Sequence, residues 1–144
     1  MKRDMELIRK ILLEIENEEN AIVDPGALQT RIISDFDNET FESEILALFE
    51  HLFLLIQAGY LETCDLEGNP LLELQHGQQV NNYIFMHHFV RLTWQGHEFI
   101  ASIKDDNVWH KIKERVGSES VNLPIGILMQ LGLSVIKTAV GLPA

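Results

Sequence analysis

The densest apolar stretch of the chain covers residues 40–61, and its spacing is that of a helix. Large apolar side chains recur there at steps of four and three: Phe41, Ile45, Leu48, Leu52 and Leu55. Residues with this spacing share one helical face, and a second apolar ridge runs beside it: Leu46, Phe49 and Phe53. Most sides of this helix must therefore be covered, either by the rest of the domain or by a second subunit.

Both ends of this helix carry residues that favour helix termini. Asp37, Asn38 and Thr40 are candidate N-caps, and Gly59 can adopt the left-handed conformation that ends a helix. An extended segment begins directly after Gly59. A Leu-rich helix that ends in Ala-Gly-aromatic-Leu and continues into a hairpin is typical of the third helix and wing of a winged-helix domain.

Similar patterns predict four further helices. They cover residues 3–17 with Asp4 as cap, 94–103 with Thr93 as cap, 108–116 with Gly117 as stop, and 124–140 with Gly141 as stop. Residues 25–33 fit two structures. Asp24 before a proline is a capping pattern for a short helix, which would be the second helix of a helix-turn-helix. Alternating Leu28, Thr30 and Ile32 would equally form a strand, and we favour the strand because the segment ends in two β-branched residues.

A turn at residues 67–70 separates two predicted strands, 62–66 and 71–75. A third strand, 83–92, alternates with largely apolar residues on both faces. The face assigned to the core consists of Ile84, Met86, His88, Val90 and Leu92. An edge strand of a small domain should have one solvated face, so the other face is either buried or a contact surface. It consists of Tyr83, Phe85, His87 and Phe89.

These elements predict an α+β, winged-helix-like domain over residues 1–117, with a β-hairpin wing and additional C-terminal helices. Residues 118–144 add a linker and the apolar last helix, whose spacing marks Leu128, Leu131 and Val135 as candidate contact residues. This helix packs on the domain, forms a dimer seam or anchors to a membrane surface, in that order of preference. Its single Lys137 argues against the membrane, because interfacial helices usually carry a Lys/Arg-rich polar face.

Composition narrows the functional classes. The chain of 144 residues has a formal net charge of −11 and one cysteine, Cys64, which excludes an intramolecular disulfide and a cysteine-based zinc site. The N-terminal stretch lacks the apolar region of a signal peptide, and no apolar run reaches the ~18–20 residues of a membrane span. We therefore expect a cytoplasmic protein with no membrane span.

The charge distribution disfavours nucleic acid as a partner. No Lys or Arg lies between Arg31 and Arg91, although the third helix and the wing, which approach DNA in a winged helix, both fall in this interval. The same interval carries ten acidic residues: Asp35, Asp37, Glu39, Glu42, Glu44, Glu50, Glu62, Asp65, Glu67 and Glu73. The basic residues cluster near the two ends of the chain: Lys2, Arg3, Arg9, Lys10, Lys104, Lys111, Lys113 and Arg115. These clusters form one patch only if the two ends meet.

No catalytic, cofactor-binding or metal-binding set emerges. The six histidines show no His-x-x-x-His spacing, and His87 and His88 point to opposite faces of a strand. Adjacent His97 and Glu98 diverge by about 100° on a helix, so they do not face a common substrate. There is no phosphate-binding loop and no nucleophile elbow. We expect a protein that is not an enzyme and needs no cofactor.

Three stretches resemble a family of uncharacterised bacterial and phage proteins that is grouped as a domain of unknown function. They are the opening MKRDMELIRKILL, residues 51–61 with the sequence HLFLLIQAGYL, and residues 92–100 with LTWQGHEFI, followed by Val108-Trp109-His110-Lys111. The resemblance implies a compact winged-helix-like domain that prophages and mobile elements often encode. It implies no activity and no catalytic residues. The chain departs from the pattern in a longer, more aromatic hairpin at residues 62–92.

Together these observations predict a non-catalytic protein-interaction module whose partner is another protein, a second copy of the chain included. Its acidic surface would engage a basic partner or mimic nucleic acid, and a phage or prophage role in adjusting a host system fits the resemblance. The alternative is a DNA-binding transcriptional regulator that uses a basic face assembled from both ends of the chain, with these residues: Lys2, Arg3, Lys111, Lys113 and Arg115.

Overall fold

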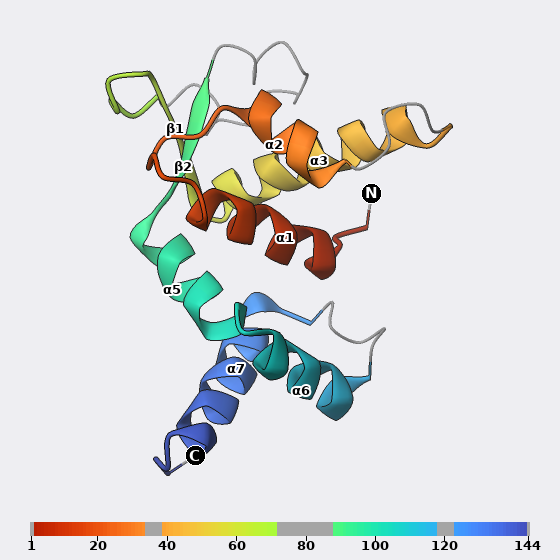
Figure 1. Ribbon diagram of the computed structural model, residues 1–144, viewed down its shortest axis with the longest axis vertical. Coiled ribbons are helices and arrows are strands. Elements are labelled where there is room, and N and C mark those ends of the chain that lie inside the picture. Colours follow the sequence, from red (N-terminus) through yellow and green to blue (C-terminus); the bar gives the residue numbers. More distant parts are fainter. Residues whose placement is uncertain (1, 34–38, 72–87, 118–122, 144) are drawn as a thin grey trace.

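The computed structural model describes residues 2–33, 39–71, 88–117 and 123–143. Its elements are α1 (Met5–Glu16), α2 (Pro25–Ile32), α3 (Phe41–Gln57), β1 (Leu61–Cys64), β2 (Phe89–Leu92), α5 (Trp94–Ile103), α6 (Asp106–Val116) and α7 (Ile125–Ala139). Figure 1 shows α1, α2, α3 and the two strands in the upper part of the molecule, whereas α6 and α7 lie in the lower part. Helix α5 connects the two parts.

The order of helices and strands is that of a winged helix. Strands β1 and β2 pair antiparallel, with Leu61 opposite Leu92 and Cys64 opposite Phe89. Val23, between α1 and α2, adds a bridge on the other side of β2, where its N–H and C=O both bond to Val90 at 2.8 and 2.9 Å. The chain thus runs helix, bridge, helix, helix, strand, strand. The predicted α+β winged-helix-like fold is confirmed.

The favoured strand at residues 25–33 is wrong, because this segment forms helix α2. The Asp24 carboxylate accepts a hydrogen bond from the N–H of Gly26 at 3.0 Å, and Pro25 occupies the first helical turn. Leu28 and Ile32, one turn apart, are both buried. A capped start and a proline whose φ already suits a helix therefore outweigh the weak strand preference of two β-branched residues at the end of the segment.

Other helix ends agree closely with their capping residues. The Asp4 carboxylate accepts from the N–H groups of Glu6 and Leu7 at 3.0 and 3.2 Å, and Gly59 has a φ of 83° just after α3. Helix α6 starts at Asp106, two residues earlier than predicted, because the carboxylate of Asp105 caps it. Helix α1 starts at Met5, two residues later than predicted, because Asp4 caps it. Side-chain capping thus accounts for both of these shifted starts.

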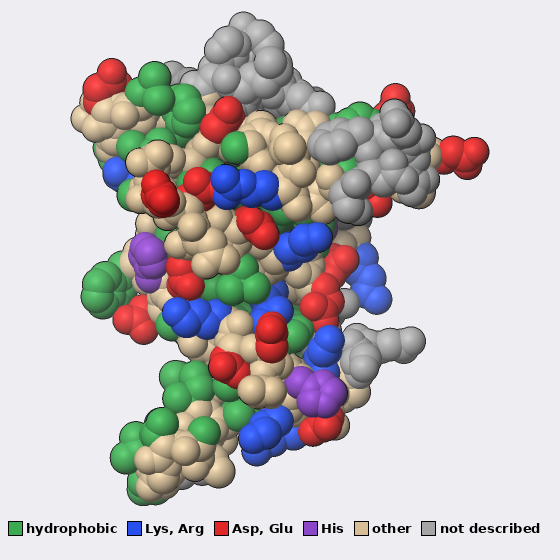
Figure 2. All heavy atoms as spheres, in the orientation of Figure 1, with side chains coloured by type: hydrophobic (Ala, Val, Ile, Leu, Met, Phe, Trp, Pro, Cys, Tyr) green, Lys and Arg blue, Asp and Glu red, His purple; other side chains and the backbone are tan. Residues whose placement is uncertain are grey.

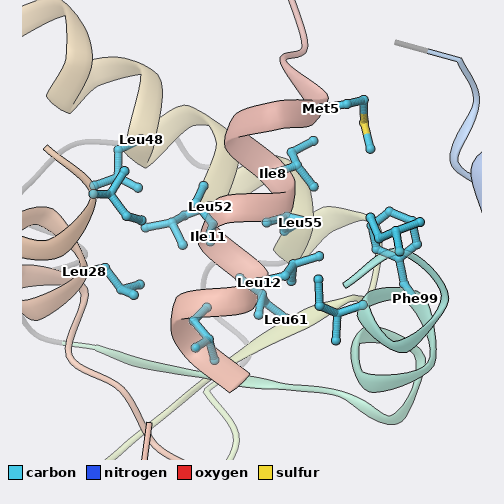
Figure 3. Packing of buried hydrophobic residues seen from close by; sticks show 14 of the residues in the cluster. Met5, Ile8, Ile11, Leu12, Leu28, Leu48, Leu52, Leu55, Leu61 and Phe99 are labelled. Carbon is cyan, nitrogen blue, oxygen red and sulfur yellow. The ribbon is translucent and has the colours of Figure 1, made fainter. Parts of the chain in front are cut away.

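Helix α1 lies at the centre of the hydrophobic core. One of its faces is almost fully buried and consists of Met5, Ile8, Ile11, Leu12 and Ile15. This helix contacts α2, α3 and α5. Figure 3 shows its side chains between those of α3, Leu48, Leu52 and Leu55, and Phe99 of α5. The core therefore joins the winged-helix part to the helices that follow it.

Helix α7 packs against α5 and α6 of the same chain. Leu128 is 0% exposed and Val135 is 3% exposed. Between them Gly132 comes so close to α5 that a Cβ atom there would lie 2.1 Å from the carbonyl oxygen of Ser102. A helix can approach another backbone this closely only where it lacks a side chain. Within the described residues, no helix is long and apolar enough to cross a membrane.

This close approach predicts that Gly132→Ala destabilises the protein by about 1–3 kcal/mol, as overpacking usually does, since the new methyl group meets backbone that cannot rotate away. Gly126→Ala is the matched control in the same helix, because a Cβ there meets nothing within 4 Å. That variant should be neutral or gain up to about 1 kcal/mol from helix propensity. Urea unfolding followed by circular dichroism measures both. Equal stabilities for the two variants would contradict the docking of α7.

Candidate functional site

The outward face of α3 is acidic. In a winged helix this helix is the one that enters the major groove of DNA. Its exposed residues include Glu42, Ser43 and Glu44 in the first turn, followed by Leu46, whose side chain is 57% exposed. In Figure 2 acidic groups, coloured red, mark the end of the molecule where α3 begins. A face of this charge repels phosphate instead of attracting it.

The basic residues at the two ends of the chain come together, but they do so through internal contacts. A guanidinium nitrogen of Arg3 donates to the carbonyl oxygen of Leu123 at 2.7 Å. The ammonium group of Lys113 donates to a carboxylate oxygen of Glu6 at 3.0 Å. Lys104 pairs with Glu16 at 3.4 Å. The basic residues of the two chain ends therefore do lie close together. However, Arg3, Lys113 and Lys104 already bind partners within the chain.

Arg9 is the clearest case of a structural cation. Its Nε and Nη2 donate to the carbonyl oxygens of Ile103 and Lys104 at 2.9 and 2.7 Å, at the end of α5. Its guanidinium also lies 5.4 Å from the ring centroid of Trp109 and 2.9 Å from a carboxylate oxygen of Asp106. Cations near a helix C-terminus satisfy the last carbonyl groups and the helix dipole. Arg9 thus joins α1 to α5 and α6.

Of the five residues proposed for a basic face, Lys2, Lys111 and Arg115 are exposed. The other two, Arg3 and Lys113, are half-buried in the contacts just described. Figure 2 shows basic and acidic groups interspersed across the lower half of the molecule. The face that is visible there carries both signs of charge in close succession.

The aromatic face predicted for the third strand is only partly described. Tyr83, Phe85 and His87 lie outside the described residues. Phe89 is half-buried and lies next to Val90, which is fully buried as the alternation predicts. Phe89 and Leu66 help to line an open groove of about 540 Å³ beside the segment that precedes α2.

The three candidate contact residues of α7 do not share one environment. Leu128 and Val135 are core residues, and Leu131 is half-buried. Contact of Leu128 or Val135 with a partner would require α7 to leave the domain. The apolar residues that this end of the chain does expose are different ones: Ile127 (44%), Leu133 (45%), Val140 (65%) and Leu142 (57%).

A further exposed surface lies on α5, and none of the candidate residues predicted from the sequence belongs to it. Gly96, Phe99 and Ile100 face the core, whereas Trp94 on the opposite side is 75% exposed. Beside it a shallow hollow of about 320 Å³ is lined by Glu16, Trp94, His97, Glu98 and Ala101. Helical periodicity could have revealed this exposure, because Trp94 does not share a helical face with the buried residues of α5.

The buried histidine, His51, has a structural role. Its Nε2 atom accepts a hydrogen bond from the backbone N–H of Asp4 at 2.8 Å, so this nitrogen carries no proton. The hydrogen of the neutral ring is therefore on Nδ1, which donates to the carbonyl oxygen of Ala47 at 2.6 Å. His110 pairs with Glu114 on the surface of α6. Among the described residues, no group of three or more His, Cys, Asp or Glu is placed to hold a metal ion.

The family to which the chain is similar is described as "Hypothetical protein (DUF2513)", and its match covers residues 2–122. The chain belongs to this family. A Haemophilus influenzae relative with the name "Uncharacterized protein" is 31% identical over 138 residues, which are 95% of this chain and 97% of the relative. No solved structure matches the chain. The predicted resemblance to a family of unknown function is confirmed.

In this DUF2513 member the matched region ends at residue 122, before α7 begins at Ile125. It includes the winged-helix part, α5 and α6. The acidic face of α3 and the exposed Trp94 therefore both lie inside the matched region. The names of the family and of the relative state no activity.

The His51 contacts predict that His51→Phe destabilises the DUF2513 protein by about 1–3 kcal/mol, because the partly buried N–H of Asp4 loses its acceptor. The same substitution at exposed His110 is the control and should change the unfolding free energy by no more than about 0.5 kcal/mol. Urea unfolding measures both. A His51→Phe variant as stable as the control would contradict the structural role of this ring.

We expect the thiol of Cys64 to react slowly in the folded protein. Its side chain is 0% exposed, and burial raises the pKa of its thiol, so the thiolate fraction at a given pH is lower than for a free cysteine. We expect a disulfide reagent to label the native protein at least about a hundredfold more slowly than the urea-unfolded chain, as for a site that opens at a cost of roughly 3 kcal/mol. Because the pKa of this thiol is raised, the labelling rate of the native protein should still increase with pH in alkaline solution. Equal rates in the two states would show that the thiol is accessible.

Proposed function

We propose that this DUF2513 protein is a non-catalytic interaction module that uses a winged-helix-like domain to bind another protein instead of DNA. The observation that carries the proposal is the acidic face of α3, where Glu42 and Glu44 occupy the exposed first turn. A DNA-binding helix gains most of its affinity from Lys and Arg that neutralise phosphates. Helix α3 offers carboxylates at the corresponding position.

The turn that follows β1 supports the same proposal. One carboxylate oxygen of Asp65 accepts hydrogen bonds from the N–H groups of Asn69 and Glu67 at 2.8 and 3.0 Å. These hydrogen bonds, of which the one from the Asn69 N–H has the largest effect, hold the pKa of the Asp65 carboxyl below its usual value. The group therefore stays ionised. With Glu67 beside it, the turn is negative, whereas the wing of a DNA-binding winged helix contacts the phosphate backbone.

The alternative, a transcriptional regulator, would use Lys2, Lys111 and Arg115, which are exposed. Three cations would neutralise few phosphates, and the salt-dependent part of DNA affinity grows with their number. The proposed protein partner is basic, by complementarity to the net charge of −11. Within this proposal the protein acts in the cytoplasm, and its resemblance to phage proteins supports a role in adjusting a host system.

The proposal predicts no DNA binding at low salt. Fluorescence anisotropy of a generic labelled duplex should not change up to about 10 µM protein. Nonspecific DNA-binding proteins have Kd values of roughly 10⁻⁴–10⁻⁶ M at physiological salt, and they bind more tightly when the salt is lowered. Such a protein would therefore give a measurable signal at this concentration. A variant with Glu42→Lys and Glu44→Lys is the positive control, because it places cations on the helix that faces DNA in this fold. That variant should show salt-sensitive binding.

Sub-micromolar binding of the native protein that weakens steeply with salt would contradict the proposal. If Lys111→Glu and Arg115→Glu together abolished such binding, the regulator would be the better account, and these residues would form its basic face.

A further inference from the structure

Several residues of the segment LTWQGHEFI (residues 92–100) make contacts that hold α5 in the fold. The Thr93 hydroxyl caps α5 by accepting from the N–H of Gly96 at 3.1 Å, and it donates to the carbonyl oxygen of Gly59. A Cβ at Gly96 would lie 2.1 Å from the carbonyl oxygen of Tyr60. The ring of Phe99 packs 5.2 Å from that of Tyr60, centroid to centroid. These residues fix α5 against the end of α3 and leave the other side of α5 outside the core.

Other side chains of α5 are exposed and together form one surface. Trp94, Glu98 and Ala101 follow the spacing of one helical face, with His97 beside them. Among the residues that the structure describes, Trp94 is the most exposed large apolar side chain, at 75%. An indole ring left in water contributes little to folding, whereas tryptophan is among the residues that most often carry the binding energy of an interface.

Carboxylates line the hollow beside this indole ring. Glu98 and Glu16 line the hollow of about 320 Å³ beside Trp94. A second hollow, of about 260 Å³, shares Glu16 and His97 with the first and adds Glu19 from the segment that follows α1. The two hollows therefore form one continuous surface, the Trp94 surface, with an aromatic ring at one side and an acidic rim.

The cations near the Trp94 surface already have acidic partners. Arg91, which lines the second hollow, pairs with Glu62 across the two strands. Lys104 contacts Glu16 at a loose 3.4 Å and is itself half-exposed. Glu98 and Glu19 are exposed. The surface as a whole therefore keeps a negative charge that a positively charged ligand would complement.

We propose that the Trp94 surface docks an arginine-bearing segment of a partner protein, with the guanidinium stacked on the indole and hydrogen-bonded to the rim carboxylates. Arginine suits such a site better than lysine because its planar group stacks on an aromatic face and binds carboxylates through two donors at once. A membrane fits less well, since the acidic rim repels the anionic lipids that attract peripheral proteins. This inference rests on the proposed role as a protein-interaction module.

The two tryptophans of the chain allow a direct test by NMR. Each gives one indole N–H signal in the ¹⁵N-labelled full-length protein. Trp109 is 3% exposed and its Nε1–H donates to Glu6, so its signal is an internal reference. Titration with a hexa-arginine peptide should shift the Trp94 signal saturably and leave the Trp109 signal in place. A hexa-lysine peptide should bind several-fold more weakly.

Variants separate this surface from the general acidity of the protein. Trp94→Ala should weaken hexa-arginine binding by at least about tenfold, as truncation of an interface anchor does, and Glu98→Gln should weaken it about threefold. Glu114→Gln removes the same charge from exposed α6, outside both the Trp94 surface and α3, and should leave the affinity unchanged. All three side chains are exposed, so thermal unfolding should match that of the native protein and confirm that each variant is folded.

Three results would overturn the inference. The first is hexa-arginine binding that Trp94→Ala does not weaken. The second is binding that shifts α3 signals and is weakened by Glu44→Gln, which would keep the acidic interaction module but place its site on α3. The third is a Trp94 signal that moves with protein concentration alone, which would assign the surface to a second copy of the chain. Failure of the proposed function itself would appear separately, as binding of the duplex.

Discussion

The burial of α1 is the constraint on which the rest of the structure depends. This helix places five large apolar side chains in the core and contacts α2, α3 and α5. Its first residues are tied to α3, because the N–H of Asp4 donates to buried His51. Its polar side is tied to the end of α5 and to α6 through Arg9 and Glu6. The winged-helix part and the later helices therefore share one helix as their common support.

This arrangement also decides where the charges of the protein are available. Several cations on and near α1, Arg9 and Lys113 among them, bind the carbonyl groups at a helix end or a carboxylate, and these contacts hold the fold together. Several acidic residues also hold the fold together, with Asp4, Asp24 and Asp105 as helix caps, but others remain available at the surface. Glu42 and Glu44 on α3, Asp65 in the turn after β1 and Glu98 on α5 all remain exposed or half-exposed. A winged helix built in this way presents carboxylates where a DNA-binding winged helix would present cations, and this is the reason for proposing a protein partner.

The sequence predicted the fold well where a capping residue or the helical spacing of apolar residues decides the local structure. The ends of α1, α3 and α5 follow from Asp4, Gly59 and Thr93. The sequence favours a strand where α2 forms, because the segment ends in two β-branched residues, but the capping pattern at Asp24 and Pro25 decides the structure. Helix α7 shows a different limit: its flanks are as apolar as its core face, so the sequence could not tell buried Leu128 from exposed Leu133.

The candidate sites were less predictable than the fold, for a physical reason. The partners of Glu6, namely Trp109 and Lys113, are more than a hundred residues away along the chain, and only the packing of α1 on α5 and α6 brings them together. The basic clusters therefore looked available in the sequence. The helical period of residues 94–103 does place Trp94 off the buried face of α5, but a tryptophan in an amphipathic helix is usually assigned to the core.

Native-state hydrogen exchange tests the central claim, that α1 is the common support, most directly. The amide hydrogens of Ile11, Leu12 and Ile15 should exchange only through global unfolding, so their protection should equal the free energy of unfolding measured with urea. Amides of α7, which packs at one end of the molecule, should exchange through smaller openings. If the amides of α1 exchanged faster than those of α3 or α7, the helix would be peripheral to the stable core, and this account of how the structure is held together would be wrong.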